Sequence, residues 1–292
     1  MDEFSAILKA RELVREAGIE SVPVEIEKYL SVSRVNAVFR VDYNLPDDQA
    51  GSSTTISGRR VIFVNAKHSL ERQRFTVLHE VGHIVLGLRS AHAAQTKASD
   101  LISYRKRPEE EILCDVFAAE LLLPEPFFRS DIRSVPIDFA SIEKLASRYQ
   151  ASLTSTGSRF AVLNEEPCIF ILSEAGKVRY MSRSLPMRQL GGWVSLGLPI
   201  PEGTLTARKL RGTDEEGPVE IEAYRWLENE QKGARCLLED VRLLTPWNQA
   251  LTLLLFEESG DEEPGNFFEE DQEPGLHELK GILPWPSKRR RR

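Results

Sequence analysis

The stretch that decides the fold is residues 72–86, R-Q-R-F-T-V-L-H-E-V-G-H-I-V-L. It carries an H-E-x-x-H motif within a helical pattern of apolar residues. His79 and His83 are four positions apart, so on a helix both imidazoles leave the same face, one turn apart. Two nitrogen ligands on a rigid helix form half of a tetrahedral zinc site. Glu80 follows the first histidine, where its carboxylate can act as a general base. The alternative is a pair of structural histidines in an apolar core.

The residues downstream decide between these interpretations, because a hydrolytic zinc site needs a third protein ligand and an open fourth position. After a loop over about residues 89–107, a second helix is expected between two prolines, Pro108 and Pro124. Its first turn holds three glutamates, at positions 109, 110 and 111, which compete as the third ligand.

Helical phase favours Glu111 among these three, because Asp115 lies one turn further on the same face. A carboxylate ligand followed at i+4 by a second acid can bind zinc and also orient a ligand histidine. This E-x-x-x-D spacing resembles that of thermolysin-like zincins.

Two segments together, R-Q-R-F-T-V-L-H-E-V-G-H and E-x-x-C-D-x-F-A-A-E-L-L-L-P, resemble the ImmA/IrrE family of bacterial metallo-endopeptidases. The similarity is good over residues 61–124 and weaker from the N-terminus to about residue 163. Cys114 replaces the alanine that is usual before Asn or Asp in the second segment, and Leu123 stands where Met is common. Neither difference changes the expected chemistry.

The resemblance implies a site and a cofactor. In that family two histidines and a glutamate bind the metal, and the glutamate after the first histidine is catalytic. Carried over, the metal ligands are His79, His83 and Glu111, and the catalytic residue is Glu80. The expected ion is Zn²⁺, with Mn²⁺ as the alternative in vivo.

Composition bounds the class of protein. At 292 residues the chain is long enough for two domains, and its net charge of −7 argues against general nucleic-acid affinity. Three scattered cysteines without C-x-x-C spacing argue against a disulfide scaffold. The sequence has no apolar run of membrane-spanning length and no secretory signal at its start. We therefore expect a cytoplasmic protein without a membrane span.

The order of patterns predicts an α+β fold. Residues 1–130 are expected to form a zincin-like peptidase domain, a small sheet plus the metal-binding helices. Residues 131–165 predict a short helical segment that resembles a helix-turn-helix. Residues 166–258 predict a C-terminal α+β or mostly-β domain, which in some relatives is a sensor-like domain of GAF type. Residues 259–292 predict a disordered tail, acidic and then basic.

Within the peptidase domain, helices are expected over residues 4–17 and 24–30, and strands over 32–41, 52–57 and 60–65. The edge strand of such a sheet can pair with an extended substrate, and residues 61–65 are the candidate edge. A plain structural strand is the alternative.

Further residues are candidates for substrate contacts. His92 and Tyr104, on the loop between the two metal-binding helices, could approach the developing oxyanion, although loop residues more often face solvent. Arg72 and Arg74 precede the histidines and could bind a substrate carboxylate, or could simply solvate the helix.

In the helix-turn-helix-like segment, a DNA reader would place Thr154, Ser155, Ser158 and Arg159 in a groove. Only one of these residues is charged, so we expect packing between domains and no direct DNA binding. Four aromatic residues of the C-terminal part are expected in the core, namely Trp193, Tyr224, Trp226 and Trp247.

The function expected from these patterns is a zinc-dependent endopeptidase. The family resemblance implies that its substrate is a cytoplasmic helix-turn-helix repressor, cut to derepress stress-response or mobile-element genes. The alternative is a metal-stabilised, non-proteolytic regulator that binds a repressor or senses a small ligand.

Overall fold

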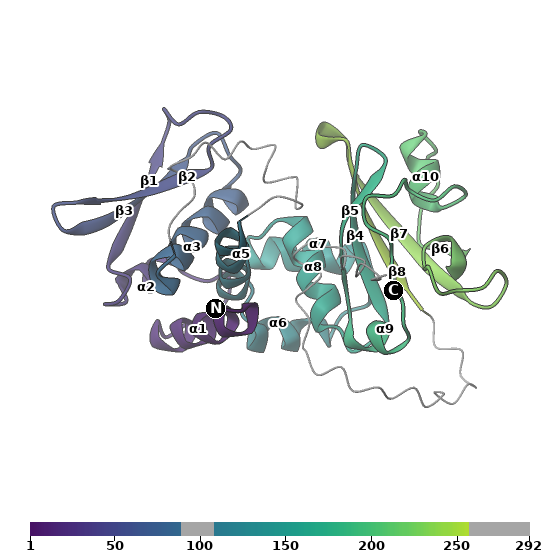
Figure 1. Cartoon of the computed structure of the whole chain (residues 1–292), viewed down its shortest axis with the longest axis horizontal. Helices are drawn as coiled ribbons and strands as arrows, with labels where there is room; N and C mark the ends of the chain where they lie inside the picture. The colour runs from purple at the N-terminus through teal and green to yellow at the C-terminus, as the bar shows by residue number, and fades with distance from the viewer. Residues whose placement is uncertain (89–107, 257–292) are drawn as a thin grey trace, which may run out of the picture.

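The computed structural model describes residues 1–88 and 108–256 (Figure 1). A three-stranded sheet and four helices form the N-terminal part, and a five-stranded sheet forms the C-terminal part. Three further helices, α6 to α8, follow α5 along the chain, and α7 and α8 lie between the two parts. The mixed composition confirms the expected α+β class.

The N-terminal helix α1 (Glu3–Glu16) forms as the apolar spacing predicts. Asp2 caps it by accepting a hydrogen bond from the Ser5 amide, and the chain leaves the helix at Gly18, whose φ is +60°. The buried face of α1 packs against α5 (Glu109–Leu122), and the short helix α2 (Ile26–Ser31) follows it.

The small sheet has the strand order β1-β3-β2. β1 (Ala37–Asp42) pairs parallel with β3 (Arg59–Asn65), and β2 (Gly51–Ile56) pairs antiparallel with β3. β2 and β3 are joined at Ser57 and Gly58, both at positive φ, as a tight hairpin turn requires.

The prediction that residues 61–65 form the sheet edge is therefore wrong. These residues belong to β3, the central strand, whose apolar side chains are largely buried. β3 is paired on both sides and packs against α3, which explains its hydrophobic run. The polar strand β2 is one edge instead.

The first strand also begins later than expected. Residues 32–36 form a turn, in which the amides of Val35 and Asn36 both donate to the Val32 carbonyl. Asn36 then adopts a φ of 41°, which ends the turn and starts β1.

Three helices lie between α5 and β4 along the chain: α6 (Glu125–Ile132), α7 (Phe139–Tyr149) and α8 (Leu153–Leu163). Asp138 caps α7 by accepting from the Ser141 amide, and Ser152 caps α8 by accepting from the Ser155 amide. No helix is predicted over α6, because Pro124 marks the end of the preceding helix. In the structure Pro124 is the N-cap of α6, and Pro126 is compatible with its first turn.

Helix α8 packs directly on the C-terminal sheet. A Cβ on Gly157 would lie 2.2 Å from the Phe170 ring, so only glycine allows this approach. The Ser158 hydroxyl lies 2.6 Å from that of Tyr180, and Arg159 pairs with Glu120 of α5. Two of the residues that a DNA reader would need on this helix are thus engaged within the chain.

The C-terminal sheet is antiparallel, with the order β5-β4-β8-β7-β6. Its strands are β4 (Cys168–Glu174), β5 (Lys177–Arg183), β6 (Val219–Glu222), β7 (Cys236–Leu244) and β8 (Gln249–Leu255). Between β5 and β6 the chain forms two short helices, α9 (Leu185–Gln189) and α10 (Leu205–Leu210). Single turns of 3-10 helix follow β6 (Ala223–Arg225) and β7 (Thr245–Trp247).

Both faces of this sheet are covered. Phe170 and Leu251 belong to a large apolar core that continues through α8 and α5 to α1. Ile169 and Leu254 belong to a second core on the opposite face, with Met187 of α9. One core thus runs from α1 to the second sheet, across the boundaries expected between the domains. These domain boundaries stay a prediction.

The four aromatic residues expected in the core of the C-terminal part differ in burial. Trp226 is buried and Trp193 is partly buried against the second core, as expected. Tyr224 is half-buried. Trp247 is 63% exposed, so its assignment to the core is wrong. It lies in the 3-10 turn between β7 and β8, a position that a tight connection leaves in solvent.

Within residues 1–88 and 108–256, no helix has both the length and the apolar character needed to cross a bilayer.

A buried ion-pair cluster joins helices α1, α5 and α8, and its removal should destabilise the fold. Glu120 of α5, with a side chain 1% exposed, accepts from Arg11 of α1 and from Arg159 of α8. Glu120→Gln leaves Arg159 largely buried without its counter-charge, which should lower the free energy of unfolding by about 3 kcal/mol.

The control is Glu165→Gln, which removes an exposed pair with Arg133 and should leave this free energy nearly unchanged, because solvent screens exposed ion pairs. Urea unfolding followed by circular dichroism measures both variants. Equal effects of the two substitutions would contradict a structural role for the buried cluster.

Candidate metal centre

The motif helix α3 (Leu70–Leu86) has a well-defined start and end. The Ser69 hydroxyl accepts a hydrogen bond from the Arg72 amide at 3.4 Å, and Gly87 ends the helix in the left-handed conformation with φ 69°. These limits place His79 and His83 in the last two turns, where both are buried.

Burial distinguishes the three glutamates of the second helix, α5, that are candidates for the third metal ligand. All three lie in its first turn, where the positive end of the helix dipole favours acidic side chains. Glu109 and Glu110 are exposed, whereas Glu111 is 1% exposed. Only Glu111 therefore faces α3, as helical phase predicts.

Small residues let the two helices approach closely. A Cβ on Gly82 would lie 3.2 Å from the Cα and 3.3 Å from the Cβ of Cys114. A larger side chain at either position would push α3 and α5 apart. Since Gly82 immediately precedes His83, this contact determines how near Glu111 comes to the histidines.

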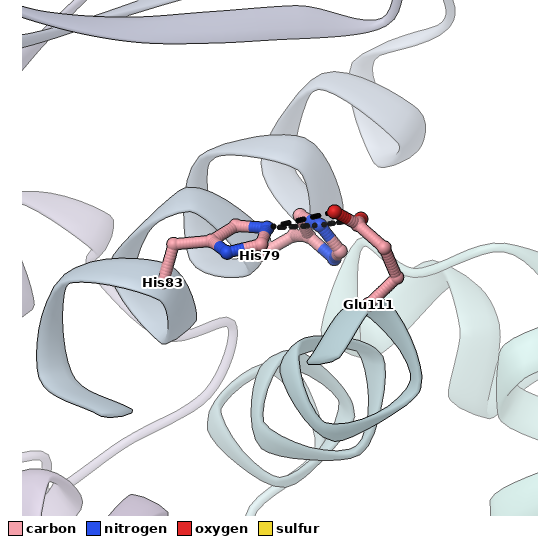
Figure 2. A group of neighbouring side chains, drawn as sticks. All are labelled: His79, His83 and Glu111. Atoms are coloured by element: carbon pink, nitrogen blue, oxygen red, sulfur yellow. Dashed lines mark hydrogen bonds and ion pairs between the residues drawn. The ribbon is translucent and has the colours of Figure 1, made fainter. Parts of the chain in front are cut away.

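The three side chains converge on one point between the helices (Figure 2). The Nε2 atoms of His79 and His83 are 3.1 Å apart. Glu111 Oε2 lies 3.1 Å from His79 Nε2, and Glu111 Oε1 lies 3.5 Å from His83 Nε2.

These separations fit a metal ion. Two ligand atoms that bind one tetrahedral zinc ion at about 2.1 Å are roughly 3.4 Å from each other. The donor set of two imidazole nitrogens and one carboxylate is also the set that hydrolytic zinc sites use. Among the residues that the structure describes, this is the one group of at least three metal-binding side chains close enough to share an ion.

Asp115 orients the first histidine from its other ring nitrogen. Its Oδ1 lies 2.8 Å from His79 Nδ1. A carboxylate only accepts hydrogen bonds, so Nδ1 carries the proton and Nε2 faces His83 and Glu111.

The same environment raises the pKa of His79. Burial alone would lower it, but the hydrogen bonds to Asp115 and Glu111 outweigh burial and raise the pKa to about 10. A metal ion at this site therefore competes with a proton on the imidazole.

Glu80, the residue predicted to be catalytic, is held from the sheet side. It is 1% exposed, and its Oε2 accepts a hydrogen bond of 2.6 Å from the Ser53 hydroxyl of β2. β2 lies close to α3 because Gly51 has no side chain: a Cβ there would lie 2.6 Å from Thr76 Cγ2.

The structure thus brings His79, His83 and Glu111 together and holds Glu80 on the same helix as the histidines. Arg74 turns away and donates to the Val24 carbonyl at 2.9 Å. His92 and Tyr104 lie outside the described residues. Sequence reasoning missed Ser53, which is 27 positions before Glu80 and carries no motif.

The part of the chain that contains this site is similar to known proteins. Residues 25–160 fit the peptidase family model Peptidase_M78, described as the IrrE N-terminal-like domain. This range contains β2, both site helices and all four predicted site residues. Residues 25–160 belong to this family. The expected ImmA/IrrE resemblance is confirmed.

A curated relative of this IrrE-like region is the radiation response metalloprotease IrrE of Deinococcus radiodurans. It is 32% identical over 122 residues, which make up 40% of this chain and 35% of that protein. The chain thus spans about a third of the length of the curated relative it matches.

The fold comparison reaches beyond the IrrE-like region. A solved structure described as a Mycobacterium tuberculosis transcriptional regulator aligns with 87% of this chain and 76% of its own, with a TM-score of 0.50. The sequence identity is 14%, so this likeness concerns the fold alone.

Metal content tests the assignment of the third ligand. Glu111→Gln should abolish stoichiometric zinc binding, because it removes the carboxylate charge between the two imidazoles. Glu110→Gln, a neighbouring exposed acid of the same helix, should retain it. Inductively coupled plasma mass spectrometry of the purified variants measures both, and zinc loss in Glu110→Gln alone would contradict the assignment.

Removal of the Asp115 carboxylate should weaken the site without abolishing it. Asp115→Asn keeps the side-chain shape but loses the charged acceptor that orients His79, which should lower zinc affinity by about 10- to 100-fold. Competition with a chromogenic chelator measures the affinity. An unchanged value would show that Asp115 does not support the metal.

Proposed function

We propose that the chain is a metal-dependent endopeptidase with zinc as its ion. The observation that carries the proposal is the convergence of His79, His83 and Glu111 at the separations of a tetrahedral site. Glu80 follows His79 on the same helix, and its carboxylate is held by Ser53. Membership of residues 25–160 in a peptidase family supports the same reading.

The residues divide the chemical work. His79, His83 and Glu111 would hold the ion, which when bound supplies Lewis-acid polarisation of the scissile carbonyl and acidifies water. Glu80 would take a proton from the attacking water and deliver it to the leaving nitrogen. The Ser53 hydroxyl would keep the Glu80 carboxylate in one orientation for both transfers.

The substrate would be a protein segment in extended conformation. β2 has β3 on one side, and no other described strand pairs with its outer edge. An extended peptide can add to such an edge through main-chain hydrogen bonds. Ser53 lies on β2, so a peptide on that edge would pass beside Glu80.

For the identity of the substrate we propose a helix-turn-helix repressor in the cytoplasm, cut to derepress stress-response or mobile-element genes. The family resemblance supports this choice. The engagement of Ser158 and Arg159 within the chain supports a protein substrate over direct DNA binding.

The test is co-expression with the repressors encoded by the same genome, followed by mass spectrometry of any fragments. The wild type should release one defined fragment pair. Glu80→Gln should retain zinc and lose cleavage by at least about 100-fold, because the general base is absent. Glu110→Gln should cleave like the wild type.

A reporter gene under the cleaved repressor separates proteolysis from sequestration. Derepression by the wild type and not by Glu80→Gln supports the peptidase. Equal derepression by both proteins would overturn it in favour of a non-proteolytic regulator.

A further inference from the structure

Arg72 lies on the face of α3 that holds the proposed metal ligands. It precedes His79 by seven residues, which on an α-helix is close to two full turns, so the two side chains leave in nearly the same direction. Along the helix axis their Cα atoms are roughly 10 Å apart. Phe75 lies between them, with its ring centroid 6.4 Å from that of His79.

The guanidinium of Arg72 has no ion-pair partner among residues 1–88 and 108–256, and the residue is exposed. Two other arginines are already engaged within the chain. Arg74 bonds to a backbone carbonyl, and Arg159 pairs with a buried carboxylate. With respect to the described residues, a cation in line with the site is therefore available to a group from outside the chain.

Contacts between β2 and α3 define the direction in which a substrate would run. Gly51 lies against Thr76, and Ser53 lies against Glu80. From Gly51 to Ser53 the strand advances about 6 Å, and from Thr76 to Glu80 the helix advances about the same distance. β2 and α3 therefore run in the same direction. An added peptide pairs most stably in the antiparallel sense. It would thus run from the Glu80 end toward Arg72.

Residues C-terminal to the scissile bond would therefore approach Arg72. Since an extended chain advances about 3.4 Å per residue, a distance of roughly 10 Å corresponds to about three residues. Guanidinium groups recognise carboxylates through paired, charge-assisted hydrogen bonds.

We propose that Arg72 is a specificity-determining residue that selects a carboxylate two or three residues C-terminal to the scissile bond. The group can be an aspartate or glutamate side chain or the C-terminal carboxylate of a short product. This inference rests on the proposed peptidase function, and it deepens that function by naming the substrate class.

A binding experiment tests Arg72 without cleavage. The zinc-loaded Glu80→Gln protein is titrated into fluorescein-labelled nonapeptides of Ala and Val that carry one Glu, one Gln or a free C-terminal carboxylate, and anisotropy is measured. The acidic peptides should bind about tenfold more tightly than a Gln peptide with an amidated terminus, as expected for one charge-assisted bond. Comparing the Glu peptide with the free-carboxylate peptide identifies the source of the acid.

The preference should disappear in Glu80→Gln/Arg72→Gln and persist in Glu80→Gln/Arg40→Gln. Arg40 is the matched control, because it is an exposed arginine on β1, the opposite edge of the same sheet. A preference that survives Arg72→Gln, or that is absent from the parent protein, overturns the proposal.

A cleavage experiment tests the position of the acid. A random decapeptide library is digested with the wild type and with Arg72→Glu, and the products are sequenced. The wild type should enrich Asp or Glu at the second or third position after the cut, and Arg72→Glu should enrich Lys or Arg there. Enrichment before the cut overturns the proposal. If no peptide is cut although the binding preference holds, the peptidase function fails and acid recognition by Arg72 stands.

Discussion

The close approach of α3 and α5 is the constraint on which the site depends. Gly82 and Cys114 meet where the two helices cross, and the absence of a side chain on Gly82 allows the contact. The crossing lies beside both histidines and beside Glu111, so a small separation of the helices would move the carboxylate out of reach. The buried carboxylates of Glu80 and Glu111 are tolerated because each is hydrogen-bonded or faces a cationic partner.

A second close approach, between β2 and α3, organises the reacting side of the site. Gly51 brings the strand onto Thr76, and two residues later Ser53 reaches Glu80. The strand that offers its edge to a peptide is thus the strand that holds the proposed general base. A substrate on this edge and the carboxylate of Glu80 are positioned by one element, which favours a fixed reaction geometry.

Local patterns predict most helices of residues 1–165, although not α6, and they single out the four candidate site residues, because those signals lie within a few residues of each other. His79, Glu80 and His83 share one helix, and Glu111 was separated from its neighbours by phase relative to Asp115. What failed depended on pairing between distant segments. The sequence predicts residues 61–65 as the edge of the small sheet, but they lie in its central strand, β3. No pattern in the sequence links Ser53 to Glu80. β7 carries Glu239 and Asp240 within its apolar run, and both acids bind segments that are distant in the sequence. In the fold, Glu239 accepts from the amides of Leu205 and Thr206, and Asp240 accepts from that of Phe139.

In the proposed site, one zinc ion would be held by two imidazoles of α3 and one carboxylate of α5. X-ray absorption at the zinc edge of the purified protein measures this directly. We expect a shell of nitrogen and oxygen atoms at about 2.0–2.1 Å that includes two imidazoles and no sulfur. A sulfur scatterer at about 2.3 Å, or a spectrum with fewer than two imidazoles, would contradict it.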